Sequence, residues 1–405
     1  MSGGRTALHD AIDGVVRSGN CSGCGMCTLL DPGLGMQLDS AGFNRPVATG
    51  ALNPAPDALS KFRTGCPGLT VAAQSPPGST RHSTMGPVVR AWRAWATDPD
   101  TRFLGSSGGA LTALAAWLAE TGEAASVVGA RAEPANPRRT VSVRITSREE
   151  ALAAAGSRYA PASNCTAAEP GDAASAFVGK PCEVSALAAI ADSASPRPLL
   201  LSFFCAGTPS QFATDRLVEG LGVAPAERPT GLWYRGHGWP GRFTVERRGT
   251  ESVSASYDES WGEHLGPAVQ WRCKICPDGV GESSDVTAAD LWEADERGYP
   301  DFTERAGVSA LIARTERGLD VVTRAIAAGV LEATPLDIDE LARVQPLQRE
   351  RRQTLLGRLV GTVAAGGRVP RFRGFGLARF AAARLRLVLR VARGTYRRRR
   401  AWGRP

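Results

Sequence analysis

The sequence predicts a mixed α/β (α+β) core, with a small cysteine-rich module before it and a basic amphipathic helix after it. Three observations carry this prediction. Strand-like and helix-like segments alternate through the middle of the chain, which is typical of an α/β sheet; four of the nine cysteines lie in the first 75 residues; and the last 35 residues hold twelve arginines and no acidic residue. The 405 residues are 43% hydrophobic, which is enough for a sizeable core and excludes a disordered or fibrous chain.

We expect four units along the chain. Residues 1–75 form a loop-rich module, and the Pro/Gly/Ser-rich segment 75–87 closes it. Residues 88–170 and 171–335 form the N-terminal and C-terminal parts of one α/β domain, the second part with its own cysteines. Residues 336–405 form a helical, basic tail.

Within the α/β domain, apolar and β-branched runs predict strands, and apolar residues at helical spacing that end at glycine predict helices. The expected strands cover 88–96, 126–130, 140–145, 175–178, 198–204 and 308–313, and the expected helices cover 110–122, 149–155, 183–191 and 318–328. Segments 232–248 and 252–257 have the pattern of antiparallel strands.

The tail differs in composition from the rest of the chain. Subtracting its twelve charges from the net +8 leaves the other 370 residues at about −4. From Leu377 onward, apolar residues recur three and four positions apart and arginines occupy another face, which predicts an amphipathic helix. Such a helix is either a solvated end of the domain or rests on an anionic membrane surface, which is the partner we expect for it.

The most specific motif is a run of three cysteines, Cys21, Cys24 and Cys27, which Cys66 and Pro67 complete later in the chain. A C-x-x-C-x-x-C run with a distant Cys-Pro is the ligand pattern of bacterial 4Fe-4S ferredoxins. Structural zinc also takes four thiolates, but its sites rarely use three cysteines so tightly spaced. The motif therefore predicts a ferredoxin-like 4Fe-4S module, with zinc as the alternative.

A second set of cysteines is spread along the chain. Cys182 and Cys205 each follow a predicted strand, and Cys273 and Cys276 form a C-x-x-C pair. Four such thiols bind either a second 4Fe-4S cluster or zinc, and their spacing alone leaves both open. The ninth cysteine, Cys165, fits a small buried hydrophobic position.

A glycine-rich turn at residues 105–109, with the sequence GSSGG, precedes the expected helix at 110–122. Its backbone N–H groups and the helix dipole would suit a phosphate group, although the turn matches neither a dinucleotide-binding nor a Walker A pattern. A plain helix cap is the alternative. The four histidines, at positions 9, 82, 237 and 264, form no catalytic or metal-ligand spacing, so we expect structural or surface roles for them.

Together these segments resemble the coenzyme F420 hydrogenase/dehydrogenase beta-subunit family of iron–sulfur flavoproteins. Eight motifs occur in order between about residues 15 and 335: CSGCGMC, SSGGALTAL, GSRY, VGKPCEVSAL, LSFFCAG, YRGHGWPG, CKICPD and SDVTAAD. Two positions depart from the usual residues of the family, because Arg158 stands where lysine is common and Ala289 where glycine is common. The basic tail lies outside the match.

The resemblance implies a flavoprotein core that binds FAD, one or two 4Fe-4S clusters, and electron exchange with coenzyme F420 or another two-electron partner. It implies that the second cysteine set is a cluster site. It also implies that FAD contacts the glycine-rich turn and the GSRY segment, through Ser107, Gly108, Gly109, Thr112, Ser157 and Arg158. Asp278, Asp285 and Asp290 match acidic positions near the second cluster, where we expect structural roles.

We therefore expect an F420-dependent oxidoreductase that passes electrons between reduced coenzyme F420, or ferredoxin, and an unidentified acceptor through FAD and two 4Fe-4S clusters. FAD accepts two electrons and releases them singly, so it connects a hydride donor to one-electron clusters. The alternatives are an electron-transfer subunit of a larger complex and a zinc-stabilised binding protein. The first residues lack a signal-peptide pattern, so we expect a cytoplasmic protein, peripheral at the inner face of the membrane through its tail, that binds no nucleic acid.

Overall fold

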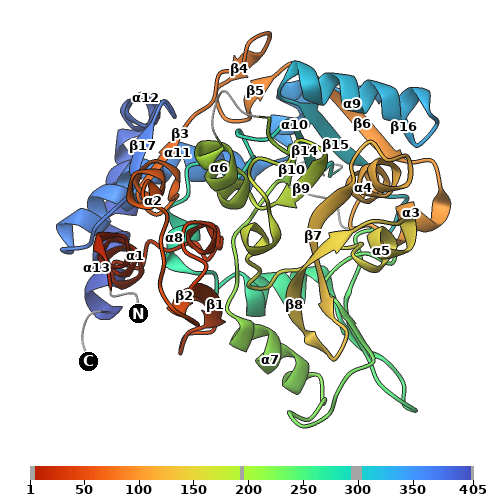
Figure 1. Cartoon of the computed structure of the whole chain (residues 1–405), viewed down its shortest axis with the longest axis horizontal. Helices are drawn as coiled ribbons and strands as arrows, with labels where there is room; N and C mark the ends of the chain where they lie inside the picture. Colours follow the sequence, from red (N-terminus) through yellow and green to blue (C-terminus); the bar gives the residue numbers. More distant parts are fainter. Residues whose placement is uncertain (1–4, 192–195, 293–302, 403–405) are drawn as a thin grey trace.

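The core of the protein is an eight-stranded mixed β-sheet with helices on both faces (Figure 1). The computed structural model describes residues 5–191, 196–292 and 303–402. In sheet order, the strands are β16 (Leu331–Pro335), β6 (Arg90–Ala96), β15 (Ser309–Ala313), β14 (Val286–Asp290), β10 (Leu199–Phe203), β9 (Ser175–Gly179), β7 (Ser126–Glu133) and β8 (Asn136–Ile145).

Five strands of this sheet run in the same direction. β10 is parallel to β14 and to β9, and β9 is parallel to β7. β6 shares their direction because β15 is antiparallel to both β14 and β6. The carboxyl ends of β6, β14, β10, β9 and β7 therefore lie along one edge of the sheet, while β8, β15 and β16 run the other way.

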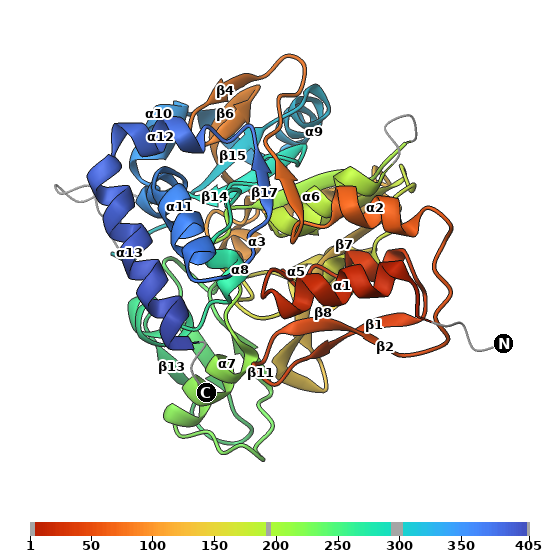
Figure 2. The same ribbon diagram turned by 90° about the vertical axis from the view of Figure 1, so that its left-hand side faces the viewer.

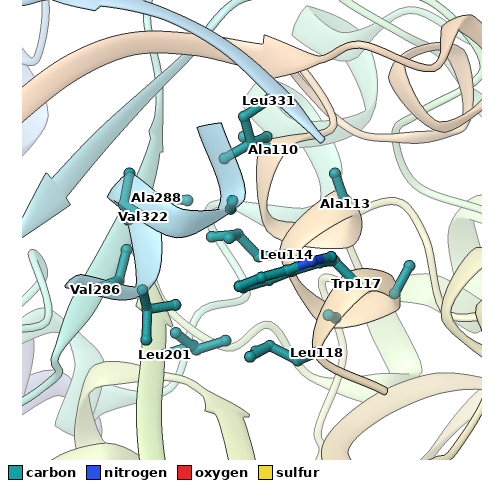
Figure 3. Close-up of a cluster of buried hydrophobic side chains, with 14 of the residues drawn as sticks. Ala110, Ala113, Leu114, Trp117, Leu118, Leu201, Val286, Ala288, Val322 and Leu331 are labelled. Atoms are coloured by element: carbon teal, nitrogen blue, oxygen red, sulfur yellow. The ribbon is translucent and has the colours of Figure 1, made fainter. Parts of the chain in front are cut away.

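On one face of the sheet, α4 (Ala110–Glu120) and α9 (Glu316–Ala327) pack against the strands, and α5 (Arg148–Ala153) packs beside α4. Figure 3 shows Leu114 and Trp117 of α4 among side chains of the sheet and of α9. Four of the seven buried residues of α4 are alanine, and their small size allows the helix to lie close to the strands. This packing fixes the start of α4 relative to the strand ends.

The other face of the sheet is covered by α6 (Pro181–Ile190) and by the N-terminal module. This module consists of α1 (Ala7–Arg17), η1 (Met26–Leu29), the hairpin β1 (Leu34–Leu38) and β2 (Asn44–Ala48), α2 (Ala58–Gly65) and β3 (Thr70–Ala72). The apolar face of α1 and the side chains Met26 and Phe62 form one buried cluster with Phe177 and Leu200 of the sheet. The module is thus packed onto the α/β domain through its own hydrophobic core.

A buried carboxylate organises the loop between η1 and β1. Asp31 accepts hydrogen bonds from the backbone N–H of Gly33 (2.8 Å) and Asn53 (3.0 Å), and its other oxygen lies 2.9 Å from His9 Nε2. Burial acts to raise the pKa of Asp31, but these hydrogen bonds and His9 outweigh it and lower that pKa. His9 therefore has the structural role expected for it.

A smaller antiparallel sheet lies beyond the main one. It contains β11 (Gly231–Trp233), β12 (Phe243–Glu246) and β13 (Val253–Ala255), and it packs with α7 (Gln211–Gly220) and the π-helix η3 (Asp258–Leu265). The remaining short elements are β4 (Thr80–His82), β5 (Gly86–Val88), α3 (Pro99–Leu104), η2 (Asn164–Ala167), α8 (Trp271–Lys274) and α10 (Ile338–Arg343).

The strands and helices expected in the α/β domain are confirmed at their positions, including the antiparallel pattern after residue 232. The sequence reading missed β14 and β16. In residues 1–75, which were expected to be loop-rich, two helices, α1 and α2, lie between the loops. β14 consists largely of small residues, VTAAD, which lack the apolar alternation of a half-buried strand because both faces of β14 are covered.

The tail forms α11 (Pro346–Ala364), β17 (Arg371–Arg373), α12 (Leu377–Ala383) and α13 (Leu385–Trp402), which lie together on one side of the molecule (Figure 2). The single helix expected from Leu377 is interrupted at Arg384, so the prediction of one continuous helix is wrong. β17 pairs in parallel with β3 and thereby fastens the tail to the N-terminal module. Among the described residues, we find no helix that is both long and apolar enough to cross a membrane.

Candidate functional site

Loops at the carboxyl edge of the sheet contain most of the residues singled out from the sequence. The glycine-rich turn follows β6, Asp290 ends β14, Cys205 follows β10 and Cys182 follows β9. Since β14, β10 and β9 are neighbours in the sheet, these positions form a row. Ligands of open α/β sheets bind at this edge, outside the carboxyl ends of the strands.

The glycine-rich turn is held rigidly against the start of β15. Ser107 Oγ donates to the carbonyl of Val308 (2.7 Å), and the N–H of Gly108 donates to Ser309 Oγ (3.0 Å). A Cβ on Gly108 would lie 2.6 Å from the carbonyl oxygen of Ala94, so only glycine fits there.

Gly109, with φ of 69°, is the N-cap residue of α4. Within the described residues, no side chain caps this helix end, which leaves its first N–H groups able to bind an anion. Thr112 lies half-buried in the first turn of α4. The turn therefore suits the phosphate end of a dinucleotide.

The two predicted residues of the GSRY segment face different ways. Ser157 Oγ lies 2.8 Å from Ser106 Oγ and so joins this segment to the glycine-rich turn. The Arg158 guanidinium instead donates to Thr140 Oγ1 and to the carbonyls of Leu232, Pro137 and Arg139. Burial lowers the pKa of Arg158. Arg158 thus ties β8 to β11, and its contact with a flavin stays a prediction.

Arg235, which the sequence reading did not single out, connects the motifs at this edge. Its guanidinium pairs with Asp290 (2.6 Å) and donates to the carbonyls of Ser106 (2.6 Å) and Pro240 (2.9 Å). Three aromatic rings surround it at 4.9–5.2 Å from their centroids, those of Trp239, Tyr257 and Trp292. The only signal in the sequence is its place in the YRGHGWPG segment.

Arg235 remains a cation although it is only 1% exposed. Burial acts to lower its pKa, but attraction to Asp290, followed by Tyr159 and Tyr257, outweighs burial and raises that pKa. A guanidinium held this way forms a fixed positive centre beside the glycine-rich turn. It can position the turn and add positive potential for an anionic ligand.

His237 also lies next to the turn. It has φ of 57°, which is rare for a residue with a side chain, and its ring stacks on Trp233 at 4.0 Å. Phe103 packs edge-on against it, and the N–H of Gly238 donates to the carbonyl of Phe103 (2.9 Å). Burial lowers the pKa of His237. These contacts agree with the structural role expected for His237.

The first cysteine set is brought together by the N-terminal module. Cys27 lies in η1, and Cys66 caps the C-terminal end of α2. Burial and then the nearby thiols of Cys24, Cys21 and Cys66 raise the pKa of Cys27, so the four sulfurs lie within electrostatic range of one another. This donor set of four thiols fits an iron–sulfur cluster.

The second cysteine set lies around the ends of β9 and β10. Pro181 and Glu183 start α6 directly after β9, with Glu183 accepting from the N–H of Lys180 (2.8 Å), and this places Cys182 in the first turn. Burial and then Cys273 raise the pKa of Cys205 to about 12. The N–H of Thr208 and the Gln270 amide lie 3.4 and 3.5 Å from Cys273 Sγ.

Buried cations surround this second set. Arg272 lies within electrostatic range of Cys276, Cys182 and Cys273. Burial acts to lower the pKa of Arg272, but these thiols outweigh burial and raise it. Lys180 and Arg351 likewise favour the charged form of Cys205. Positive groups and N–H donors to sulfur are the features that stabilise thiolate ligands of an iron–sulfur cluster.

Cys165 connects the two cysteine sets. Its N–H donates to the carbonyl of Cys24 (3.3 Å), and its thiol lies 3.6 Å from the carbonyl of Glu183, next to Cys182. The hydrogen bond from Cys165 is the main cause that lowers the pKa of Cys24 to about 7. Cys165 is fully buried in the hydrophobic cluster that joins the N-terminal module to the sheet, as predicted, and it also makes these polar contacts.

Within residues 5–191, 196–292 and 303–402, we find no three His, Cys, Asp or Glu side chains close enough together to hold one metal ion. A cubane cluster is wider than a single ion, so its four thiolates stand farther apart than the ligands of one ion. The fit of both sets to clusters rests on their thiols, cations and N–H donors.

The three aspartates of the second half have structural contacts. Asp285 forms a bidentate ion pair with Arg197 (2.8 and 2.9 Å) and accepts a hydrogen bond from the N–H of Leu200. Asp278 accepts three backbone N–H groups in the loop after Cys276, and Asp290 pairs with Arg235. Ala289 lies buried in β14.

Comparison with known proteins agrees with this geometry. Residues 91–169 match the family model for the N-terminal domain of the coenzyme F420 hydrogenase/dehydrogenase beta subunit, and residues 172–339 match the model for its C-terminal domain. A search of curated proteins finds no match.

Among solved structures, the chain is similar to one from the F420-reducing NiFe hydrogenase complex of Methanosarcina barkeri, a structure of its xenon derivative. The TM-score is 0.52 and the identity 20%, over 67% of this chain and 91% of that one. This likeness shows a shared fold. With both family domains matched in order, the chain belongs to the coenzyme F420 hydrogenase/dehydrogenase beta-subunit family.

Proposed function

We propose that this protein is an iron–sulfur flavoprotein oxidoreductase that passes electrons between reduced coenzyme F420, or ferredoxin, and an unidentified acceptor. The observation that carries the proposal is the row of sites at the carboxyl edge of the sheet. The glycine-rich turn with Arg235 lies at one end, the second cysteine set follows, and Cys165 leads on to the first set. Electron transfer needs such a series of neighbouring redox sites.

FAD would bind at the glycine-rich turn, and its chemistry there is the exchange of two electrons as a hydride and of single electrons in turn. The N–H groups at the start of α4 would hold its pyrophosphate. Arg235 holds the turn in place through the carbonyl of Ser106, and Ser157 links the GSRY segment to it. Ser107, Gly108, Gly109 and Thr112 are proposed as contacts with the cofactor.

Two 4Fe-4S clusters would occupy the cysteine sets. Cys21, Cys24, Cys27 and Cys66 would be the ligands of one cluster, and Cys182, Cys205, Cys273 and Cys276 those of the other. Lys180, Arg272 and Arg351 offset the negative charge of the second ligand set. Cys165 lies between the sets, because its N–H donates to the carbonyl of Cys24 and its thiol contacts the carbonyl of Glu183, the residue after Cys182.

Cofactor content of the anaerobically purified protein tests the proposal. We expect about eight iron atoms, an equal amount of acid-labile sulfide and one FAD per chain. Cys273→Ser should reduce iron to about four atoms, whereas Cys165→Ser, which changes a thiol that is no ligand, should retain all of it. Zinc in place of iron, with no flavin, would refute the redox assignment.

The donor is tested on the same protein. Reduced coenzyme F420 and reduced ferredoxin should each be mixed with the oxidised enzyme, and bleaching of the flavin and cluster absorbance followed. Bleaching by one donor but not the other would identify it. If neither donor reduces a fully loaded protein, the proposed donors are wrong while the cofactor assignment stands.

A second candidate is an electron-transfer subunit without its own substrate. The similar solved structure comes from a hydrogenase complex, which favours this alternative. Purification from the native source should then yield a stoichiometric partner protein. A chain that is isolated alone and turns over reduced F420 with a soluble acceptor would argue against it.

A further inference from the structure

The arginine-rich tail is a feature that electron transfer does not explain. Residues 371–405 contain twelve arginines and no aspartate or glutamate. In Figure 2, α13 lies on the outside of the molecule next to α11. The tail is therefore folded and accessible, and its chemistry indicates a partner outside the redox site.

α13 is firmly attached to α11. A Cβ on Gly357 would lie 2.5 Å from the carbonyl oxygen of Val388, and one on Gly361 would lie 2.3 Å from that of Ala392. Only glycine allows the two backbones to approach this closely. Val388 and Thr395 are buried in this contact. The apolar face predicted from the sequence is therefore covered by α11 in part only.

Two residues of the predicted apolar face, Leu385 and Leu389, remain exposed, and Tyr396 lies exposed further along the helix. Leu385, Leu389 and Tyr396 are 59%, 50% and 40% exposed. At about 100° per residue they form one strip along α13, beside the buried seam. The two helices run parallel, and this places Val360 of α11, also 52% exposed, on the same side of the seam.

Exposed arginines border this strip. On α13 they are Arg386, Arg390, Arg393, Arg397 and Arg400. The helical period places all of them next to the strip and around the outer face of the helix. An apolar strip of about 17 Å beside a band of cations, with no acidic residue within it, is the pattern of a surface that lies in a membrane interface.

We propose that the outer surface of α11 and α13 docks the protein onto an anionic lipid surface. Its arginines would neutralise lipid phosphates while Leu385, Leu389 and Tyr396 enter the headgroup region. Protein interfaces are themselves enriched in arginine, so an acidic protein is included as a competing partner in the test below. Binding of nucleic acid would not require the apolar strip, and the rest of the chain is acidic.

Vesicle cosedimentation of the full-length protein tests this proposal. The vesicles contain either phosphatidylcholine alone or phosphatidylcholine with about one third phosphatidylglycerol. We expect binding to the anionic vesicles only, and weaker binding at high salt. Deletion of the tail is a poor test, because it would uncover the seam on α11.

Point variants keep the fold intact. Arg386→Gln/Arg390→Gln/Arg393→Gln should weaken binding on the order of 100-fold, at roughly fivefold per arginine. Arg63→Gln/Arg216→Gln/Arg248→Gln removes the same charge from other exposed positions and is the matched control.

Leu385→Ser/Leu389→Ser should weaken binding roughly tenfold without any change of charge, since each leucine loses contact with the lipid. Equal effects of the two arginine triples, or binding that ignores both leucines, would overturn the proposal. So would capture by duplex DNA or an acidic protein with no affinity for anionic vesicles. None of these measurements depends on cofactor content, so the outcome is independent of the proposed redox function.

Discussion

Replacement of Arg235 is the sharpest test of how the flavin end of the site is held. In Arg235→Met the buried volume is largely kept, but Asp290 loses its partner and the carbonyls of Ser106 and Pro240 lose their donors. Removing one member of a buried ion pair costs about 3–5 kcal/mol. The Asp290 side chain is 25% exposed, so water partly solvates it, and we expect about 3 kcal/mol.

The assay is urea unfolding of the anaerobic protein, combined with the FAD content of each variant. Arg235→Met should lower the free energy of unfolding by this amount and reduce bound FAD, because the turn loses its anchor at Ser106. Arg235→Lys keeps the charge but not the fork of donors, so it should fall in between. Adding Asp290→Asn to Arg235→Met should recover on the order of 2 kcal/mol, since no unpaired charge is then left.

The matched control is Arg144→Met. Arg144 pairs with Glu169 at a similar distance, 2.6 Å, but the two side chains are 41% and 65% exposed. Such a surface pair contributes about 0–1 kcal/mol. If both methionine variants lose the same stability, or if Arg235→Met keeps its full FAD content, the assignment of Arg235 as the anchor of the turn is wrong.

Three further predictions concern other parts of the molecule. Gly108→Ala should lower the free energy of unfolding by about 1–3 kcal/mol and reduce bound FAD, because the added Cβ meets rigid backbone. The control Gly220→Ala, whose Cβ meets no atom within 4 Å, should do neither, as measured by thermal unfolding and flavin absorbance. Cys165→Ala should leave the iron content unchanged but shift the midpoint potential of one cluster in a redox titration monitored by EPR, and an unchanged potential would remove Cys165 from the proposed connection. Asp31 has a lowered pKa in the folded protein, so its stabilising contribution is complete above about pH 4 and is lost as the pH falls below that. In Asp31→Asn the free energy of unfolding should therefore fall less steeply between about pH 4 and about pH 2 than in the parent protein, and an unchanged pH dependence would contradict this.

Local patterns carried most of the sequence-based prediction. The ferredoxin-like spacing of Cys21, Cys24 and Cys27 lies within seven residues, and the strands of the α/β domain follow from runs of apolar and β-branched residues. Both depend on chain geometry over a few residues, which is why they could be identified without a structure. The family assignment rests on the order of such local motifs and is confirmed by the matches to both domains.

Contacts between distant segments could not be foreseen. Arg158 was expected at the flavin from its motif, yet its guanidinium donates to β8 and β11, since several carbonyls of these strands converge there. Arg235 gave no signal of its own because two of its partners, Ser106 and Asp290, lie far from it in the sequence. Cys165 was expected as a buried hydrophobic residue, and only the approach of η2 to α6 revealed its hydrogen bonds to Cys24 and to Glu183, which follows Cys182.

The sequence by itself determined the local elements, the cysteine pattern of the first set and the amphipathic, arginine-rich character of the tail. Tertiary structure alone decided that strands β9 and β10 are neighbours, and so that Cys182 and Cys205 meet. It also decided which apolar face of α13 is covered, because that depends on glycines of α11 some thirty residues earlier. Periodicity defines the faces of a helix, but only the packing of other elements determines which face remains exposed.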